Sequence, residues 1–282
     1  MCLILFAYRV HPQLPLVVAA NRDEFHARPS AAAGWWADDA GVYAGRDLQD
    51  GGTWVGVHRA GRFAAVTNFA EEPPPPTAAL RSRGELTTGF LRGTRSPADY
   101  LAEVAGRAMQ YRGFNLLLGD FAGSEPSLHF FGNRDGGPRA LPPGVYGMSN
   151  DVLDCDWPKV NSGKRAISEA LADLPTFAVE AEALELQRVR RLTDALFAVL
   201  GDRHVPPDEL LPKRGRDIEM ERRVAPSFVT SELYGTRAST VILVQRTPSG
   251  HEMHVAERRF GPLARELGRG YRTIPIAAAA RP

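Results

Sequence analysis

The chain has 282 residues, of which 44% are hydrophobic and 24% charged, with a net charge of +1 at pH 7. This composition is typical of a globular protein that buries a full core. The balanced charge gives no electrostatic case for binding nucleic acid or acidic lipid. Two cysteines, Cys2 and Cys155, are too few for a disulfide framework or a zinc-finger spacing.

The apolar start of the chain resembles a signal peptide only superficially. Residues 2–8 have no basic stretch before them and meet Arg9 at once, and Asp23 and Glu24 argue against a mitochondrial presequence. No apolar run approaches the roughly 20 residues that a membrane helix needs. We therefore expect a cytoplasmic protein without a transmembrane segment.

Pairs of short apolar runs, each flanking a turn segment, predict four β-hairpins. In chain order they are Leu3–Val10 with Leu16–Ala20, Thr53–His58 with Arg62–Phe69, Phe114–Gly119 with Ser127–Phe131, and Ser239–Arg246 with Glu252–Arg259. Such hairpins indicate antiparallel sheets rather than parallel crossover units.

Apolar residues at helical spacing predict helices between the hairpins, over residues 160–174 and 192–200 and, with a weaker pattern, over 84–91 and 99–111. We interpret Pro73–Pro76 as a stiff loop, because hairpins continue on both sides of it. We expect one α+β domain over residues 1–276, a sandwich of two antiparallel sheets covered by helices, followed by a loose tail over residues 277–282.

Cys2 is the most informative single residue. If Met1 is removed, the thiol and the α-amine belong to one residue, which then carries both a nucleophile and its base. An unperturbed α-amine titrates near ~7.7–8.0 and a thiol near ~8.5, so modest tuning gives a working pair at neutral pH. A cysteine in this position also occurs by chance or for packing, so its surroundings decide.

The second predicted strand leads into Asn21-Arg22-Asp23-Glu24. In an antiparallel hairpin the end of strand two lies beside the start of strand one, so Cys2 and Asp23 are expected to be neighbours. One interpretation is a salt-bridged turn. In the other, Asp23 accepts a hydrogen bond from the α-amine of Cys2 and orients it.

Three further polar residues stand at predicted strand ends. Asn68 and Asn150 are candidate oxyanion donors, although asparagine at a strand end is often simply a turn former. Arg237, at the start of the last hairpin, could hold a substrate carboxylate or Asp23, or lie on the surface.

Other motifs are weaker. Gly51-Gly52-Thr53-Trp54 lacks the features of a phosphate loop, so its glycines are expected to permit close backbone approach, with Trp54 as core or cavity wall. His251-Glu252-Met253-His254 is one residue short of the zinc-protease motif and falls on a strand, so we predict no metal site.

Taken together, the motifs closely resemble the NRDE family, also called the transport and Golgi organisation family. They are Met1-Cys2-Leu3-Ile4, Asn21-Arg22-Asp23-Glu24, Gly45-Arg46-Asp47-Leu48, Gly51-Gly52-Thr53-Trp54, Thr67-Asn68-Phe69, Met148-Ser149-Asn150, Trp157-Pro158-Lys159-Val160 and Thr236-Arg237. The resemblance implies an N-terminal-nucleophile (Ntn) hydrolase-like four-layer αββα sandwich.

A more distant similarity is to the choloylglycine and penicillin-V amide hydrolases, which use an N-terminal cysteine. It implies Cys2 as nucleophile, Asp23 as partner of the amine, Asn68 and Asn150 on the oxyanion side and Arg237 as the far arginine. Those enzymes have an arginine three residues before the aspartate, where this chain has Ala20; the nearby arginine is Arg22. We assign Asn21, Arg22 and Trp54 to substrate binding.

Two functions follow from this pattern. In the first, Cys2 hydrolyses a non-peptide amide or acyl substrate through an acyl-enzyme and needs no cofactor. In the second, the same scaffold binds or carries haem or a lipid, with Cys2 as an iron ligand or a plain strand residue. The chain has no C-x-x-C-H motif, so any haem would be bound noncovalently.

Overall fold

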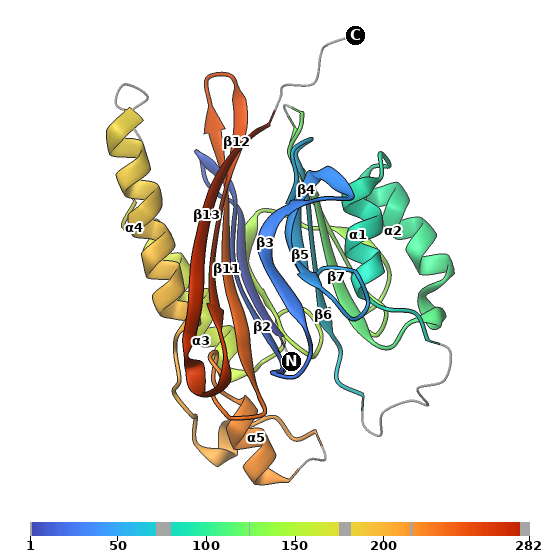
Figure 1. The fold of residues 1–282 in the computed structure, drawn as a ribbon, viewed down its shortest axis with the longest axis vertical. Helices are drawn as coiled ribbons and strands as arrows, with labels where there is room; N and C mark the ends of the chain where they lie inside the picture. Colours follow the sequence, from blue (N-terminus) through green and yellow to red (C-terminus); the bar gives the residue numbers. More distant parts are fainter. Residues whose placement is uncertain (1, 72–79, 124, 175–181, 215–216, 277–282) are drawn as a thin grey trace.

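The computed structural model describes residues 2–71, 80–123, 125–174, 182–214 and 217–276 (Figure 1). Met1, the proline run at residues 73–76 and the predicted tail over residues 277–282 lie outside the described residues. Two antiparallel sheets pack face to face, and helices cover their outer faces.

The first sheet has six strands in the order β10-β1-β2-β11-β12-β13. Its strands are β1 (Cys2–His11), β2 (Leu14–Phe25), β10 (Gly144–Met148), β11 (Tyr234–Thr247), β12 (Gly250–Phe260) and β13 (Glu266–Ile276). β2 therefore lies between β1, its hairpin partner, and β11, which comes from the far end of the chain.

The second sheet has seven strands in the order of the sequence. They are β3 (Ser30–Trp36), β4 (Asp39–Asp47), β5 (Val55–His58), β6 (Arg62–Asn68), β7 (Phe114–Asp120), β8 (Ser127–Gly132) and β9 (Arg139–Ala140). Every strand pairing in both sheets is antiparallel.

All four predicted hairpins are present, as β1–β2, β5–β6, β7–β8 and β11–β12. Two strand boundaries differ from the prediction. β2 runs on through Asn21-Arg22-Asp23-Glu24 to Phe25, and β11 begins at Tyr234, before Arg237. The two extensions pair with each other, from Tyr234 opposite Phe25 onward. This long-range pairing keeps the polar residues within a strand.

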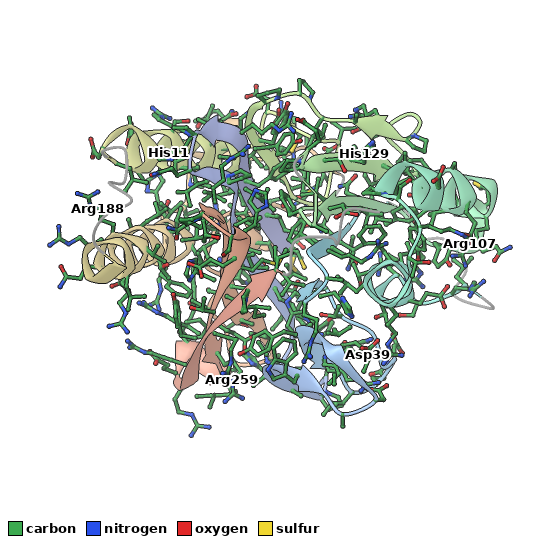
Figure 2. All side chains as sticks on the ribbon, turned by 90° about the horizontal axis from the view of Figure 1, so that it is seen from above. His11, Asp39, Arg107, His129, Arg188 and Arg259 are labelled. Carbon is green, nitrogen blue, oxygen red and sulfur yellow. The ribbon has the colours of Figure 1, made fainter. Side chains whose placement is uncertain are left out.

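Two helical layers enclose the sheets (Figure 1). α3 (Pro158–Ala172) and α4 (Glu182–Leu200) cover the six-stranded sheet, and α1 (Gly84–Arg92) and α2 (Pro97–Gly106) cover the seven-stranded sheet. From above, Arg188 on α4 and Arg107 after α2 mark opposite edges (Figure 2). A short helix, α5 (Ile218–Val224), lies between α4 and β11 in the chain, and 3-10 turns occupy 108–110, 208–210 and 262–264.

The helix expected over residues 99–111 is shorter than predicted. α2 starts at Pro97, with the Ser96 side chain accepting a hydrogen bond from the Asp99 N–H as an N-cap. It ends at Gly106, where glycine weakens a helix, and a 3-10 turn over residues 108–110 follows.

Strand alternation produces the layers. Ile4 and Phe6 of β1 face the core between the sheets, whereas Leu3 and Leu5 face the core under α3 and α4. A third core lies between the seven-stranded sheet and α1 and α2. Residues 2–8 of β1 and 14–20 of β2 are buried on both faces, which accounts for their continuously apolar sequence. The result is the expected αββα sandwich. Among the described helices, none is long and apolar enough to span a membrane.

Candidate active site

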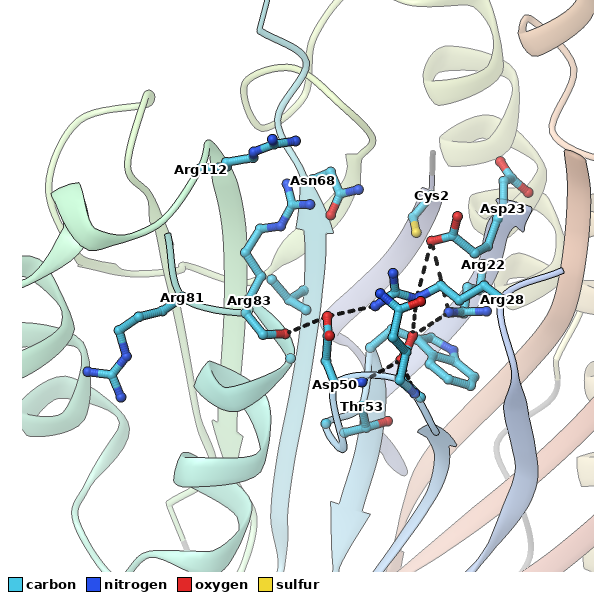
Figure 3. Close-up of a pocket in the computed structure, with 18 of the residues that line it drawn as sticks. Cys2, Arg22, Asp23, Arg28, Asp50, Thr53, Asn68, Arg81, Arg83 and Arg112 are labelled. Carbon is cyan, nitrogen blue, oxygen red and sulfur yellow. Dashed lines mark hydrogen bonds and ion pairs between the residues drawn. The ribbon is translucent and has the colours of Figure 1, made fainter. Parts of the chain in front are cut away.

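A cavity of about 480 Å³ opens at the end of the sandwich where β1 begins and β2 and β6 end (Figure 3). Its walls come from the end of β2, the β4–β5 loop, the end of β6 and the segment leading into α1. The lining residues are Cys2, Arg22, Asp23, Glu24, Arg28, Asp47, Gln49, Asp50, Gly52, Thr53, Trp54, Val66, Asn68, Leu80, Arg81, Ser82, Arg83, Gly84 and Arg112.

Cys2 places its sulfur in this cavity. It pairs with Arg22 across the β1–β2 hairpin, so both side chains project from the face that meets the second sheet. Burial raises the pKa of the Cys2 thiol, and the charge of Asp23 raises it further. A hydrogen bond from the Asp23 N–H to the sulfur acts in the opposite direction. Ser149 Oγ anchors the strand by donating to the Cys2 carbonyl at 2.8 Å.

Asp23 is a neighbour of Cys2, as the hairpin geometry predicted, but its carboxylate is turned away from the sulfur (Figure 3). Thr236 Oγ1 donates to Asp23 Oδ1 at 2.7 Å, and Tyr234 Oη donates to the Asp23 carbonyl at 3.1 Å. Burial raises the pKa of Asp23, and the ammonium of Lys159 opposes that rise.

Arg22, Arg28, Asp47 and Asp50 form one side of the cavity, which we call the paired wall. Asp47 Oδ2 accepts from Arg22 Nη2 at 2.8 Å and from Arg28 Nε at 2.6 Å. Arg28 Nη2 reaches Asp50 Oδ2 at 2.7 Å. Burial raises the pKa of Asp47, but the hydrogen bond and charge of Arg28 hold it below its usual value overall.

One guanidinium nitrogen of Arg22 is available to a ligand. Its guanidinium stacks 4.4 Å from the centre of the Trp54 ring, and only 5% of the residue is exposed. Within the described part of the chain, its buried Nη1 has no hydrogen-bond partner. An unused buried donor opposite Cys2 is suited to a ligand oxygen. Arg22 and Trp54, which the sequence analysis assigned to substrate binding, both line the cavity.

Asn68, Arg83 and Arg112 form the opposite side, which we call the open wall (Figure 3). Arg83 Nη1 donates to the Gly113 carbonyl at 3.1 Å, which fixes the guanidinium. A Cβ added at Gly52 would lie 2.5 Å from the Gly84 backbone, so the β4–β5 loop packs directly on the start of α1. That contact joins the two walls and confirms the close approach expected of the glycines.

The two asparagines have different surroundings. Asn68 lines the cavity. Asn150 is buried and does not line it: Asn150 Nδ2 donates to the Asn68 carbonyl at 2.7 Å. In this geometry Asn150 holds the end of β6 in place, and Asn68 is the amide that can meet a ligand.

Two other candidate residues lie away from the cavity lining. Asn21 Nδ2 donates to the Leu200 and Ser227 carbonyls at 2.8 and 2.7 Å, and Asn21 Oδ1 accepts from Ser239. Its amide therefore joins β2 to the end of α4 and to the segment before β11.

Arg237 stands at a bulge in β11. Its Nη1 donates to the Phe25 and Arg28 carbonyls at 2.8 and 3.0 Å. It fixes the turn after β2, which carries Arg28 of the paired wall, and Asp23 is not among its hydrogen-bond partners.

Sequence reasoning missed several residues around the cavity. Arg28, Arg83 and Arg112 stand in segments that carry no apolar periodicity. The family motifs contain three more of them, Asp47, Lys159 and Thr236. Their place in the motifs could have marked them as candidates, but their contacts depend on tertiary packing. Lys159, on α3, is 6% exposed, and burial lowers its pKa while Asp23 and Cys2 oppose this. Its Nζ donates to the Val224 carbonyl at 3.0 Å.

Comparison with known proteins identifies the family. The model of the Transport and Golgi organisation 2 (TANGO2) family matches residues 1–262. The chain belongs to this family. The NRDE resemblance, which rested on motifs spread along the chain, is thereby confirmed.

Three relatives illustrate the similarity to TANGO2 proteins. The Transport and Golgi organization protein 2 homolog of Bos taurus is 34% identical over 255 residues, covering 86% of this chain and 88% of the relative. The Homo sapiens homolog is 33% identical with the same coverage, and the Drosophila melanogaster protein is 27% identical with 91% of each chain covered.

Among solved structures, a Caenorhabditis elegans N-acylethanolamine-hydrolyzing acid amidase (NAAA) ortholog matches 86% of this chain and 92% of its own. The identity is 9% and the TM-score 0.39, a likeness that carries no argument about the site.

Within the described residues, no group of three or more histidine, cysteine or acidic side chains could hold a metal ion.

Proposed function

We propose that this TANGO2-family protein hydrolyses a non-peptide amide bond with Cys2 as the nucleophile. The observation that carries the proposal is the pairing of Cys2 with Arg22. It sets a thiol and an unused, buried guanidinium donor side by side in one cavity. Acyl transfer needs a nucleophile and a nearby hydrogen-bond donor that stabilises the negative charge on the carbonyl oxygen.

The reaction has two steps and needs Cys2 to be the first residue. The α-amine takes the thiol proton as the sulfur attacks the carbonyl carbon, and Arg22 Nη1 or the Asn68 amide donates to the oxygen that becomes negative. The C–N bond then breaks, and the α-ammonium returns the proton to the departing amine. Water next adds to the thioester, the C–S bond breaks, and a carboxylic acid and the free thiol result.

The electrostatics fit the use of an internal base. Burial raises the pKa of the thiol, so the resting group keeps its proton and a base must remove it during attack. The Asp23 carboxylate, turned from the sulfur and held by Thr236, serves to orient the α-amine. The charge of Lys159 helps to keep that carboxylate ionised.

Intact-mass measurement of the cell-expressed protein tests the first requirement. The proposal expects a mass lower by one methionine residue, and a chain that retains Met1 contradicts it.

In a screen of amide substrates, Cys2→Ala should reduce turnover on the order of 10⁴-fold or more with an unchanged circular dichroism spectrum. Cys155→Ala is the matched control, because Cys155 lies outside the cavity lining; full turnover by Cys2→Ala rejects the enzyme.

A second candidate is noncovalent binding of haem. The cavity favours it in one respect: its lining contains a thiol and five arginines, which suit an iron ligand and two propionates. Titration of the protein with haem would then give a saturable Soret shift that Cys2→Ala removes. Amide turnover without any such shift supports the hydrolase instead.

A further inference from the structure

We propose that Arg83 and Arg112 bind a carboxylate of the substrate, so that the enzyme acts on amides that carry a carboxylate, such as N-acyl amino acids. The inference rests on the proposed function for the fate of the substrate. The anion site itself stands on the charges and geometry of the cavity.

The first observation is a difference in pairing among the arginines of the cavity. Five arginines line it: Arg22, Arg28, Arg81, Arg83 and Arg112. The first three have carboxylates close by, Asp47 at 2.8 and 2.6 Å from Arg22 and Arg28 and Glu85 at 2.6 Å from Arg81. In the described part of the molecule, neither Arg83 nor Arg112 forms an ion pair with a carboxylate.

The second observation is the environment of Arg83. The residue is only partly exposed, and burial lowers its pKa, which means that its positive charge is held at a cost. Among the surrounding carboxylates, Glu71 and Glu24 oppose this lowering of the pKa. A charged group in such a place gains free energy from an anion that enters the cavity.

The third observation is placement. The guanidinium groups of Arg83 and Arg112 lie beside Asn68, across the cavity from Cys2 (Figure 3). The bond from Arg83 Nη1 to the Gly113 carbonyl uses one of its five N–H groups and leaves a fork to face a ligand. A carboxylate held there leaves the rest of a small molecule to reach the sulfur.

A purely structural role does not account for this arrangement. The bond to Gly113 needs only one donor, which a neutral glutamine could supply without placing a cation by the cavity. Among the arginines that line the cavity, Arg22, Arg28 and Arg81 each receive a carboxylate at short range. We infer that the missing carboxylate of the open wall is brought by the substrate.

Binding to the Cys2→Ala protein, which lacks the nucleophile, tests the anion site independently of turnover. The probes are N-octanoylglycine and its carboxamide, N-octanoylglycinamide, which differ only in the charged group, and calorimetry measures both dissociation constants. We expect the acid to bind at least about tenfold more tightly than the carboxamide, as hydrogen bonds to a charged group imply. Equal affinities, or no binding of the acid, overturn the proposal.

Variants in the Cys2→Ala background show which residues produce the preference for the acid. Arg83→Gln should remove most of the preference for the acid, Arg112→Gln should reduce it, and Arg83→Lys should restore part of it. Arg139→Gln, whose arginine is bonded to Asp135 outside the cavity lining, should leave it unchanged. An undiminished preference in a folded Arg83→Gln protein rejects the assignment. Absence of amide turnover by the wild-type protein, with the preference for the acid intact, would reject only the hydrolase.

Discussion

The two walls of the cavity differ in what binds the guanidinium groups of their arginines. On the paired wall, Asp47 neutralises Arg22 and Arg28 and fixes them by hydrogen bonds. On the open wall, Arg83 is held by a backbone carbonyl and keeps its charge. This difference indicates that the arginines of the paired wall stabilise the cavity, whereas those of the open wall can bind a ligand.

Removing the centre of the paired wall should have the largest effect. Asp47→Asn leaves two partly buried guanidinium groups without their carboxylate and should lower the free energy of unfolding by about 3 kcal/mol. Urea denaturation measures the change. Glu125→Gln is the matched control, because its carboxylate is 89% exposed in its pair with Arg9 and should cost no more than about 0.5 kcal/mol. Equal losses in the two variants would end the distinction between the walls.

The same variant predicts a pH dependence. The folded-state pKa of Asp47 lies below the unfolded value of roughly 3.9, so its stabilising contribution is complete above that pH and is lost as the pH falls through the folded pKa. The difference in unfolding free energy between wild type and Asp47→Asn should therefore be constant from pH 7 to 5. It should shrink below about pH 4. A difference that grows on acidification contradicts the assignment.

The contact that joins the walls should be next in size. Gly52→Ala would place a Cβ 2.5 Å from the Gly84 backbone, which cannot rotate away, and should destabilise the protein by about 1–3 kcal/mol. Because the shift moves Arg83 as well, the affinity for N-octanoylglycine should also fall. Gly106→Ala, with no heavy atom within 4 Å of the added carbon, serves as the control. A fully stable Gly52→Ala protein would show that the walls are not rigidly joined.

The thiol between the walls should react slowly. Burial raises the pKa of Cys2, so at pH 7 its alkylation by iodoacetamide should be at least about fivefold slower than in the urea-unfolded chain, and should rise with pH. Peptide mapping separates it from Cys155, whose pKa burial raises to about 12. If Cys2 is alkylated equally fast in the native and the unfolded chain at pH 7, the positive charges of the walls lower the pKa of the thiol by as much as burial raises it.

A side-chain bond between the two sides of the cavity should matter least. Ser82 Oγ donates to Asp50 Oδ2 at 3.3 Å, in an exposed position. Ser82→Ala should change the free energy of unfolding by no more than about 0.5 kcal/mol and leave probe binding unaltered. A larger loss would assign the alignment of the walls to this bond rather than to the Gly52–Gly84 contact.

The four layers were implied by the resemblance to the NRDE family. The residues themselves determined the hairpins and the neighbourhood of Cys2 and Asp23. These features depend on local alternation of side chains and on short turns, which a single stretch of chain specifies. The contact between Cys2 and the end of β2 follows from a hairpin of adjacent strands. Asn68 and Trp54 were likewise expected at the cavity from the motifs that hold them.

Tertiary structure decided how the polar residues at the end of β2 are used. Arg22 and Asp23 line the cavity and Asn21 does not, and the pairing of β2 with β11 determines which groups Asn21 and Arg237 contact. Arg83 comes from a segment without a regular pattern, and its charge matters because no carboxylate of the described residues forms an ion pair with it. Pairing of strands that are more than 200 residues apart in sequence, and the balance of charge in a shared cavity, are sums over distant residues that no local pattern encodes.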